Sequence, residues 1–356
     1  MEERLKADLF CGLDAFSASS TTLNEAFDVF MRLKVNLRKS TEQLYRDVYE
    51  RYVRNTLGLR AVGSIKPSQA KSLYIDLQLE KQLNYGTVKK VQIVLNQVFN
   101  MLVADDVIRK NPTTGVVKTV RINPEGVRHA LTQEEQDRFL DFMSTYRLGS
   151  HWHPLTTFQF GTGVRIGEAA ALKWQDVDFE EKEIHISRSL MGITDEKGNK
   201  SYVEGPPKSQ AGNRTIPMFR DVETMLQAEY KRQYLLAGCM DIGAQYVFRA
   251  KDGGPIHMDT ITSTYKHLCI ACNKDETSRA ESEGRAPLLI PVFTPHVIRH
   301  TFCTRLCEQD VNVKVVQDIM GHSTAQITMD IYNEATKSVK KNSFEELEGK
   351  IRVSAG

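Results

Sequence analysis

The stretch from residue 294 to residue 332 constrains the fold more than any other part of the chain. His296 and Arg299 stand three residues apart in an uninterrupted run that opens with Thr-Pro. Proline is favoured in the first turn of a helix, and side chains three residues apart share a helix face. The Gly-His-Ser sequence around His322 breaks this pattern and predicts a turn, and Tyr332 follows ten residues later. These polar side chains are therefore expected to belong to one site.

Two histidines, an arginine and a tyrosine suit a site for an anionic phosphodiester. The guanidinium of arginine pairs with two phosphate oxygens at once and stays charged at any relevant pH. A tyrosine hydroxyl, with a pKa of about 10 when free, is a weak nucleophile until such cations surround it. The stretch thus indicates chemistry on a phosphate ester.

These residues also resemble a known family. HVIRH, followed by GHS and a tyrosine, is similar to the C-terminal signature of the tyrosine recombinases, the phage integrase family. Two upstream motifs extend the resemblance: GTGVRIGEAAALKWQDVD, which contains Arg165, and KSQAGNRTIP, which contains Lys208. The similarity covers roughly Leu131 to Thr336, and a looser one covers Thr21 to Pro112. No motif is decisive by itself, but their combination in this order is specific.

The resemblance implies a set of catalytic residues. The set is Arg165, Lys208, His296, Arg299, His322 and Tyr332. Attack on phosphorus passes through a five-coordinate state that gathers negative charge. Arg165 and Arg299 would bind that charge in a fixed geometry, with His322 as a further donor.

The remaining members of the set would handle protons and form the covalent bond. Lys208 would protonate the leaving 5′-oxygen, although a lysine on a hairpin, taken alone, is typical of a solvated surface. His296 would accept or share the tyrosine proton, or hold the phosphate. Tyr332 would attack phosphorus and keep the strand end as a 3′-phosphotyrosine. Such a reaction needs no metal ion and no other cofactor.

Residues 22–112 read as a helical domain. Helices are expected over residues 24–37 and 41–57, from Pro67 towards Leu83, and after a cap at Gly86-Thr87. In the fourth helix, apolar residues recur at helical spacing and predict a core face. They are Val88, Val91, Leu95, Val98 and Leu102.

The other side of this fourth helix is the predicted DNA-binding face. Lys89, Lys90, Gln92 and Asn96 carry amine and amide groups that suit phosphates and base edges. The surrounding region also has an excess of lysine and arginine over acidic residues, whereas the rest of the chain is on balance acidic. Such a basic third suggests contact with nucleic acid. A well-solvated basic helix face is the alternative interpretation.

The remaining boundaries follow from composition. Residues 113–129 contain Pro and Gly without a helical period and read as a linker. Residues 1–21 form a separate N-terminal segment, too short for the arm-site DNA-binding domain that many relatives carry. The resemblance implies a mainly α fold with a small β-sheet (α+β). A helical core-binding domain (22–112) and a catalytic domain (130–336) would close on DNA as a C-shaped clamp.

Local patterns predict the elements of the second domain. Thr132 and Glu135 have capping-box spacing. Ile184 and Ile186 indicate a strand, Lys208 is expected at the end of a hairpin, and residues 246–248 suggest another short strand. Residues 273–287 are polar and charged, which favours a loop.

The cysteines and the hydropathy bear on compartment and metal content. Six cysteines lie scattered without disulfide-framework spacing, which predicts reduced thiols and a cytoplasmic protein. Cys269, Cys272 and the nearby His267 lack the second ligand pair of a structural zinc site. The sequence contains neither an apolar run long enough to span a bilayer nor a signal peptide, so no membrane partner is expected.

The expected partners are double-stranded DNA at recombination sites and further copies of the chain. Strand exchange between two duplexes needs a homo-tetramer, with a monomer or dimer otherwise, and an excision or bending accessory protein is a further candidate. The tail, residues 337–356, can form a short helix capped by Ser343 with Phe344, Leu347 and Ile351 on one face. Docking of this helix on a neighbouring protomer, or on its own domain, would bury that face.

Three functions remain open from the sequence. The first is a site-specific DNA recombinase that integrates or excises DNA, most similar to integrases of conjugative transposons. The second keeps the tyrosine chemistry in a Xer-like dimer resolvase or a type IB topoisomerase-like relaxer. The third is a DNA-binding regulator with vestigial catalytic residues, which the complete set of six residue types disfavours.

Overall fold

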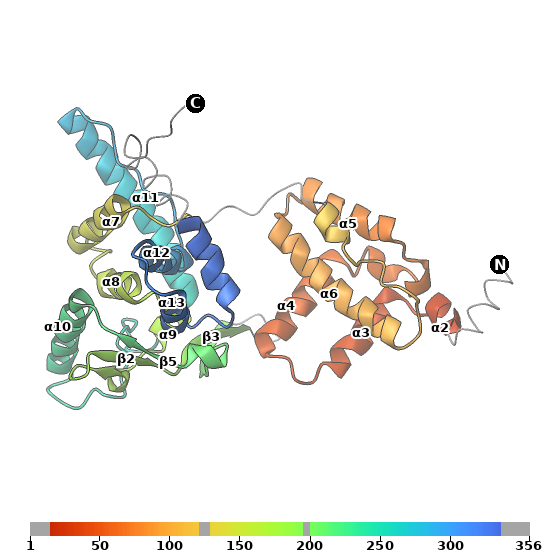
Figure 1. Ribbon diagram of the computed structural model, residues 1–356, viewed down its shortest axis with the longest axis horizontal. Coiled ribbons are helices and arrows are strands. Elements are labelled where there is room, and N and C mark those ends of the chain that lie inside the picture. The colour runs from red at the N-terminus through yellow and green to blue at the C-terminus, as the bar shows by residue number, and fades with distance from the viewer. Residues whose placement is uncertain (1–14, 121–128, 195–199, 336–356) are drawn as a thin grey trace, which may run out of the picture. The chain divides into compact units, whose positions relative to one another are not determined.

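The computed structural model describes residues 15–120, 129–194 and 200–335. The chain divides into two compact units, Met1–Val127 and Arg128–Gly356 (Figure 1). The division falls inside the segment that the sequence assigned to a linker. Among the described residues, no helix combines the length and the apolar content that crossing a bilayer requires.

The first unit is helical. Its α-helices are α2 (Ala15–Ser20), α3 (Leu23–Leu33), α4 (Lys39–Tyr52), α5 (Pro67–Leu79) and α6 (Tyr85–Ala104), with 3-10 turns at Leu57–Leu59, Val62–Ser64 and Val116–Thr119. α6 begins slightly earlier than expected because Asn84 is its cap: the Asn84 side chain accepts a hydrogen bond from the Thr87 amide at 2.9 Å. The sequence had placed that cap at Gly86-Thr87.

The core of the first unit forms around α6. All five apolar residues that the helical period singled out, from Val88 to Leu102, are buried. Phe27 of α3 and Tyr49 of α4 stack in the same cluster, with ring centroids 3.6 Å apart. Burial of each large apolar side chain contributes roughly 1.5–3 kcal/mol to folding. Apolar periodicity was therefore a reliable guide to this helix.

The chain that follows α6 packs back onto the first unit. Val117 and Val120 are buried in its core. The Gln78 amide of α5 donates to the Val120 carbonyl at 3.1 Å. Residues up to 120 thus belong structurally to the first unit, although the sequence counted everything from residue 113 as linker.

The second unit combines helices with two small sheets. Its α-helices are α7 (Gln133–Thr145), α8 (His153–Thr162), α9 (Ile166–Ala170), α10 (Arg220–Leu236), α11 (Met258–Glu283), α12 (Pro295–Glu308) and α13 (Val313–Met320). Its strands are β1 (Val177–Asp178), β2 (Glu183–Ile186), β3 (Ser189–Thr194), β4 (Lys200–Gly205) and β5 (Arg214–Pro217), with 3-10 turns at Trp174–Asp176 and Gln210–Gly212. Residues 325–335 are also helical.

The strands pair antiparallel in two separate sheets. β1, β2 and β5 form one sheet in that order, with Ile184 opposite Ile216 and Ile186 opposite Arg214. β3 and β4 form a hairpin. Residues 246–248, expected to be a strand, contribute only an isolated bridge from Tyr246 to Lys173.

α8 is the central helix of the second unit and packs against both α10 and α12 (Figure 1). At Gly161 the approach of α10 is so close that a Cβ atom would lie 2.3 Å from the Val222 side chain. The capping box that the sequence predicted for α7 is present: the Glu135 amide donates to the Thr132 hydroxyl, and the Thr132 amide donates to the Glu135 carboxylate.

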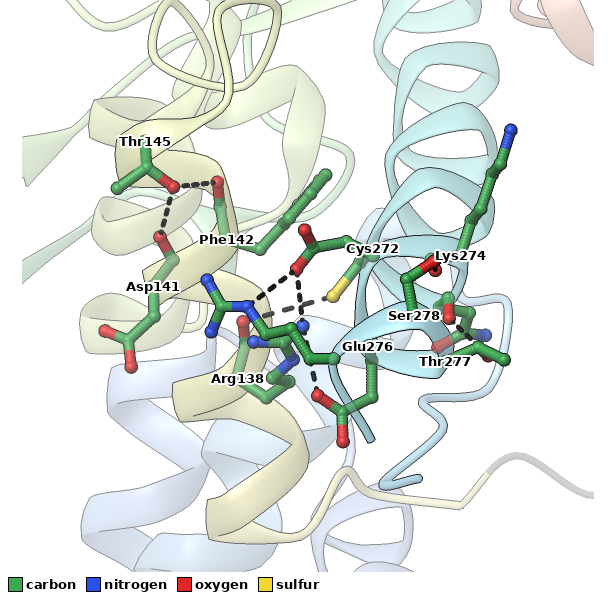
Figure 2. Close-up of polar contacts among 12 residues, drawn as sticks. Arg138, Asp141, Phe142, Thr145, Cys272, Lys274, Glu276, Thr277 and Ser278 are labelled. Carbon is green, nitrogen blue, oxygen red and sulfur yellow. Dashed lines mark hydrogen bonds and ion pairs between the residues drawn. The ribbon is translucent and has the colours of Figure 1, made fainter. Parts of the chain in front are cut away.

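The loop predicted over residues 273–287 was wrong for most of its length, because α11 continues to Glu283. Long-range contacts stabilise this charged extension. Arg138 of α7 points towards α11 and pairs with Glu276 at 3.2 Å (Figure 2). Arg285, which follows α11, pairs with the same carboxylate. The Leu288 amide donates to Glu276 at 2.9 Å, so the returning chain lies along the helix.

Candidate active site

Arg299 lies in the second turn of α12, where it is almost fully buried. Its side chain donates to the Gly163 carbonyl at 2.9 Å and to the Met320 carbonyl. Burial, followed by the nearby Arg165, lowers the pKa of Arg299 to about 9. That value is still above neutral pH, so the guanidinium stays charged.

The turn before α9 approaches α12 closely. Gly163 has a left-handed backbone, with φ at 61°, and a Cβ atom there would lie 2.3 Å from the Phe302 ring. Only glycine meets both demands without strain. The glycine turn therefore brings its carbonyl to Arg299 and sets the position of Arg165 two residues later.

Arg165 is the N-cap residue of α9 and remains partly exposed. Its guanidinium donates to the Gly321 carbonyl at 2.9 Å and to the Glu168 carboxylate at 2.7 Å. The Arg165 backbone amide also donates to Glu168, at 3.0 Å. Glu168 thus fixes both the main chain and the side chain of Arg165.

The sequence did not assign Glu168 and Arg214 to the site, but both belong to the cluster. Glu168 is 2% exposed, and its carboxylate also accepts from Arg214 of β5 at 2.9 Å. Burial alone would raise the pKa of Glu168, but Arg214 and Arg165 overcome it and hold that pKa below its usual value. Glu168 and Arg214 lie within the two upstream motifs, one in each. The motifs therefore contained both residues, but nothing in the pattern indicated what they do.

Three successive carbonyls at the end of α13 each accept a hydrogen bond from a different arginine. Arg214 donates to Ile319 at 2.6 Å, Arg299 donates to Met320, and Arg165 donates to Gly321. The last carbonyls of a helix have no partner within the helix and carry partial negative charge. The end of α13 therefore gathers three guanidinium groups beside His322.

His322 is buried directly after this turn. Its Nδ1 lies 2.9 Å from the hydroxyl of Thr328, which is also buried. Burial, followed by Arg299 and Arg165, lowers the pKa of His322 to about 4, so the ring is neutral at neutral pH. If the threonine hydroxyl donates to Nδ1, then Nε2 carries the proton and is available as a donor. Thr328 was not among the residues predicted for the site.

Tyr332 lies in the helical residues 325–335 and packs against the buried cluster of α12 and α13. Its hydroxyl donates to the Asp310 carboxylate at 2.9 Å. Asp310 sits in the turn between α12 and α13 with a left-handed backbone, φ 54°. The hydrogen bond from the hydroxyl and the negative charge of Asp310 raise the pKa of Tyr332. This contact was not foreseen.

The two other predicted residues are exposed. His296 lies one turn before Arg299 on α12. Lys208 lies three residues beyond the end of β4, in the connection to β5, and not at a hairpin tip. Hydrogen bonds among the described residues thus join Arg165, Arg299 and the His322 turn, while Tyr332 is held by Asp310.

The predicted DNA-binding face of α6 requires a correction. Lys89 and Lys90 are exposed, as expected. Gln92 is instead buried, and its amide donates to the Thr113 carbonyl at 2.8 Å. Asn96 accepts from the Asn111 amide at 2.8 Å. The segment after α6 thus covers Gln92, whereas Asn96 remains half-buried and the lysine pair remains exposed.

Comparison with known proteins identifies the family. The sequence profile of the phage integrase family matches residues 129–338. A tyrosine recombinase XerC-like protein of Caldanaerobacter subterraneus subsp. tengcongensis is 30% identical over 333 residues, which cover 90% of this chain and 80% of the relative. The chain belongs to the phage integrase family, and it is a tyrosine-type site-specific recombinase.

Transposon proteins are among the similar ones. The transposase from transposon Tn916 of Enterococcus faecalis is 29% identical over 339 residues, covering 93% of this chain and 78% of the relative. The Tn1549 transposon integrase, solved in complex with transposon right end DNA, is 28% identical with a TM-score of 0.76. That match covers 92% of this chain and 100% of the solved one. The predicted family, the similarity to integrases of conjugative transposons, and the mainly helical fold with small sheets are confirmed.

Proposed function

We propose that this recombinase cuts one strand of double-stranded DNA with Tyr332 and rejoins it to a new partner. The Tyr332 oxygen attacks the phosphorus, and the bond from phosphorus to the 5′-oxygen breaks. The products are a 3′-phosphotyrosine and a free 5′-hydroxyl. Because the ester retains the bond energy, the reverse attack by another 5′-hydroxyl reseals DNA without a nucleotide.

The observation that carries this proposal is the clustering of cations at the end of α13. Arg165, Arg214 and Arg299 meet there with only one carboxylate, Glu168, among their described hydrogen-bond acceptors. The remaining positive charge favours a phosphodiester. Fixed donors of this kind stabilise the charge that develops on the phosphoryl oxygens. His322 is buried and neutral, so it adds a hydrogen-bond donor without placing another positive charge beside the three arginines.

The two exposed residues of the set, Lys208 and His296, are proposed to act on protons or on the phosphate. Lys208 gives a proton to the departing 5′-oxygen. His296 accepts the tyrosine proton or holds the phosphate. Tyr332 must first exchange its Asp310 contact for the phosphate, so DNA binding and the release of the tyrosine hydroxyl are coupled steps.

The proposed substrate is the end DNA of a mobile element. The Tn1549 integrase was solved with transposon right end DNA, and the Tn916 relative is a transposase. Exchange between two duplexes requires four protomers, so a homo-tetramer is proposed as the active assembly. The proposed compartment is the cytoplasm.

A nicked suicide substrate tests the chemistry. After cleavage the short fragment diffuses away, and the protein stays covalently attached to the DNA. We expect an SDS-resistant adduct with the unaltered protein and none with Tyr332→Phe, while specific DNA binding persists. An adduct that survives the substitution would assign the nucleophile to another residue, and an absent adduct with the unaltered protein would favour a regulator without catalysis.

A dimer resolvase is the second candidate function, because the 30% identical relative is named XerC-like. Two plasmids distinguish the candidates. One carries two directly repeated resolution sites, and the other carries both ends of a mobile element. If the second plasmid yields excised circles and the first is not resolved, the result supports the integrase. If the first plasmid is resolved and the second yields no circles, the result supports the resolvase.

A further inference from the structure

Arg214 connects three parts of the second unit through one buried guanidinium. Its side chain is 6% exposed. Nη2 donates to Glu168 at 2.9 Å, Nε donates to the Ile319 carbonyl at 2.6 Å, and Nη1 donates to the Gly212 carbonyl at 3.0 Å. The three acceptors lie on α9, at the end of α13, and in the turn that precedes β5.

The Gly212 contact controls the connection that carries Lys208. A Cβ atom at Gly212 would lie 2.4 Å from the Pro207 ring, so the two ends of the connection are in direct contact. Pro207 is buried and immediately precedes Lys208. By holding Gly212, Arg214 therefore fixes the base of the short loop from which the Lys208 side chain projects.

The Ile319 contact attaches the same loop to the turn that carries His322. A Cβ atom at Gly321 would lie 2.7 Å from the Ala211 carbonyl and 3.0 Å from Nη1 of Arg214. The loop and the turn are thus in close contact, with Arg214 between them. A displacement of one would displace the other.

We propose that Arg214 is a positioning residue that holds the Lys208 loop against the His322 turn, so that Lys208 can protonate the leaving 5′-oxygen. The inference rests on the proposed role of Lys208 as the acid. A planar fork with donors in three directions meets the three acceptors, whereas a lysine ammonium cannot reach all of them at once. In the step itself, Lys208 passes one proton to the 5′-oxygen as the phosphorus–oxygen bond breaks, and it regains a proton from solvent.

A sulfur substitution isolates this role. Two suicide substrates are compared that differ only in the bridging 5′-atom, oxygen or sulfur. A thiolate leaves without protonation, so a defect in acid catalysis disappears on the sulfur substrate. Lys208→Ala is the reference variant. Arg138→Gln is the matched control, because Arg138 is a partly buried, ion-paired arginine of the second unit but lies on α7 away from the cluster.

The expected result concerns the rate of adduct formation. Arg214→Gln and Arg214→Lys should slow cleavage of the oxygen substrate by about tenfold or more, within the range of general acid catalysis. The sulfur substrate should restore most of that loss, as for Lys208→Ala, and Arg138→Gln should show no difference between substrates. If Arg214→Gln does not fold, Arg214→Lys, which keeps the charge beside Glu168, carries the test.

Two outcomes would overturn the proposal in different ways. An equal loss on both substrates for the Arg214 variants, with Lys208→Ala still restored by sulfur, would leave Lys208 as the acid and limit Arg214 to structural support. A Lys208→Ala defect that sulfur does not relieve would remove Lys208 from the acid role. In that case the proposed function of Lys208 fails, and the positioning role of Arg214 fails with it.

Discussion

At the scale of single residues, Asp310 holds the hydroxyl of Tyr332. The carboxylate accepts a hydrogen bond from the neutral hydroxyl and repels the phenolate, so the pKa of Tyr332 is raised. We predict that Asp310→Asn lowers this pKa, because the negative charge is removed while an acceptor oxygen remains. Asp310→Ala, which removes both, should lower it further towards the ordinary value of about 10.

The measurement is an NMR titration of protein labelled at the tyrosine ring carbon, followed from about pH 8 to pH 12, where free tyrosine titrates. Tyr332→Phe assigns the signal. A Tyr332 titration that is the same in the unaltered protein and both variants would show that Asp310 does not control the hydroxyl in solution.

His322 makes a second prediction at this scale, on stability. Its pKa is about 4 in the folded protein against an ordinary 6.5. Between these values the unfolded chain binds a proton that folded His322 does not, so this contribution to stability is present above about pH 6.5 and is lost as the pH falls. From pH 7 to pH 5, the loss attributable to His322 should be on the order of 1–2 kcal/mol.

Urea unfolding of the unaltered protein and of His322→Gln tests this sign. Both tryptophans, Trp152 and Trp174, lie in the second unit, so their fluorescence reports the unfolding of that unit. The drop in the free energy of unfolding between pH 7 and pH 5 should be smaller in the variant. Equal drops would mean that the ring titrates normally in the folded protein.

The sequence could predict that certain site residues lie together, but not the partners that they acquire on folding. Arg165, Arg299 and His322 were expected near one another, and their contacts meet at the end of α13. Thr328 and Asp310 were not assigned, because nothing local marks a threonine or an aspartate as the partner of a particular ring or hydroxyl. Their roles arise only when distant segments pack together.

At the scale of elements, the lysine pair of α6 is the part of the predicted DNA face that remains exposed. We predict that Lys89→Ala with Lys90→Ala weakens DNA binding and flattens its salt dependence. Each lost phosphate contact should reduce the slope of log K against log salt by about 0.9. The measurement is fluorescence anisotropy with labelled duplex at several salt concentrations.

A matched double variant controls for net charge. Lys71→Ala with Lys81→Ala also removes two exposed lysines from the first unit, at α5 and just after it. This control should keep the original slope. If both double variants change the slope equally, the effect comes from total charge, and the α6 pair makes no phosphate contacts of its own.

Prediction of the elements failed where contacts with other chain segments decide whether a residue is buried or helical. The amphipathic pattern of α6 identified its core face, but it could not reveal that Gln92 is buried against Thr113 or that Asn111 donates a hydrogen bond to Asn96. Likewise, the charge of residues 273–283 suggested a loop. Residues up to Glu283 are helical, and Glu276 pairs there with the distant Arg138 and with Arg285, which follows the helix. Polarity alone does not distinguish a solvated face from a paired one.

At the scale of the whole molecule, the prediction concerns the tail. Residues 337–356, with the expected stripe of Phe344, Leu347 and Ile351, lie outside the described residues. A helix this short is marginal alone and needs a groove in which to bury its apolar face. We predict that ending the chain after Lys341 spares monomer binding to a half-site but impairs assembly and strand exchange.

Gel-shift assays on half-sites and full sites separate the two effects. Full-site complexes should be lost at concentrations that still give half-site complexes, and recombinant product should fall accordingly. Normal product formation by the truncated protein would make the tail dispensable. A matched Phe344→Ala variant of the full-length chain should reproduce part of the defect if the apolar stripe is responsible.

The three arginines bind α13 only through its main-chain oxygens in the described contacts, and this has a consequence for mutational tolerance. Every amino acid supplies a carbonyl, so the anchor survives side-chain replacement at Ile319 and Met320 whenever the new side chain fits the core. Gly321 differs, because any Cβ atom there would meet the Ala211 carbonyl. A saturation library selected for recombination should accept several apolar residues at the first two positions and return glycine alone at the third.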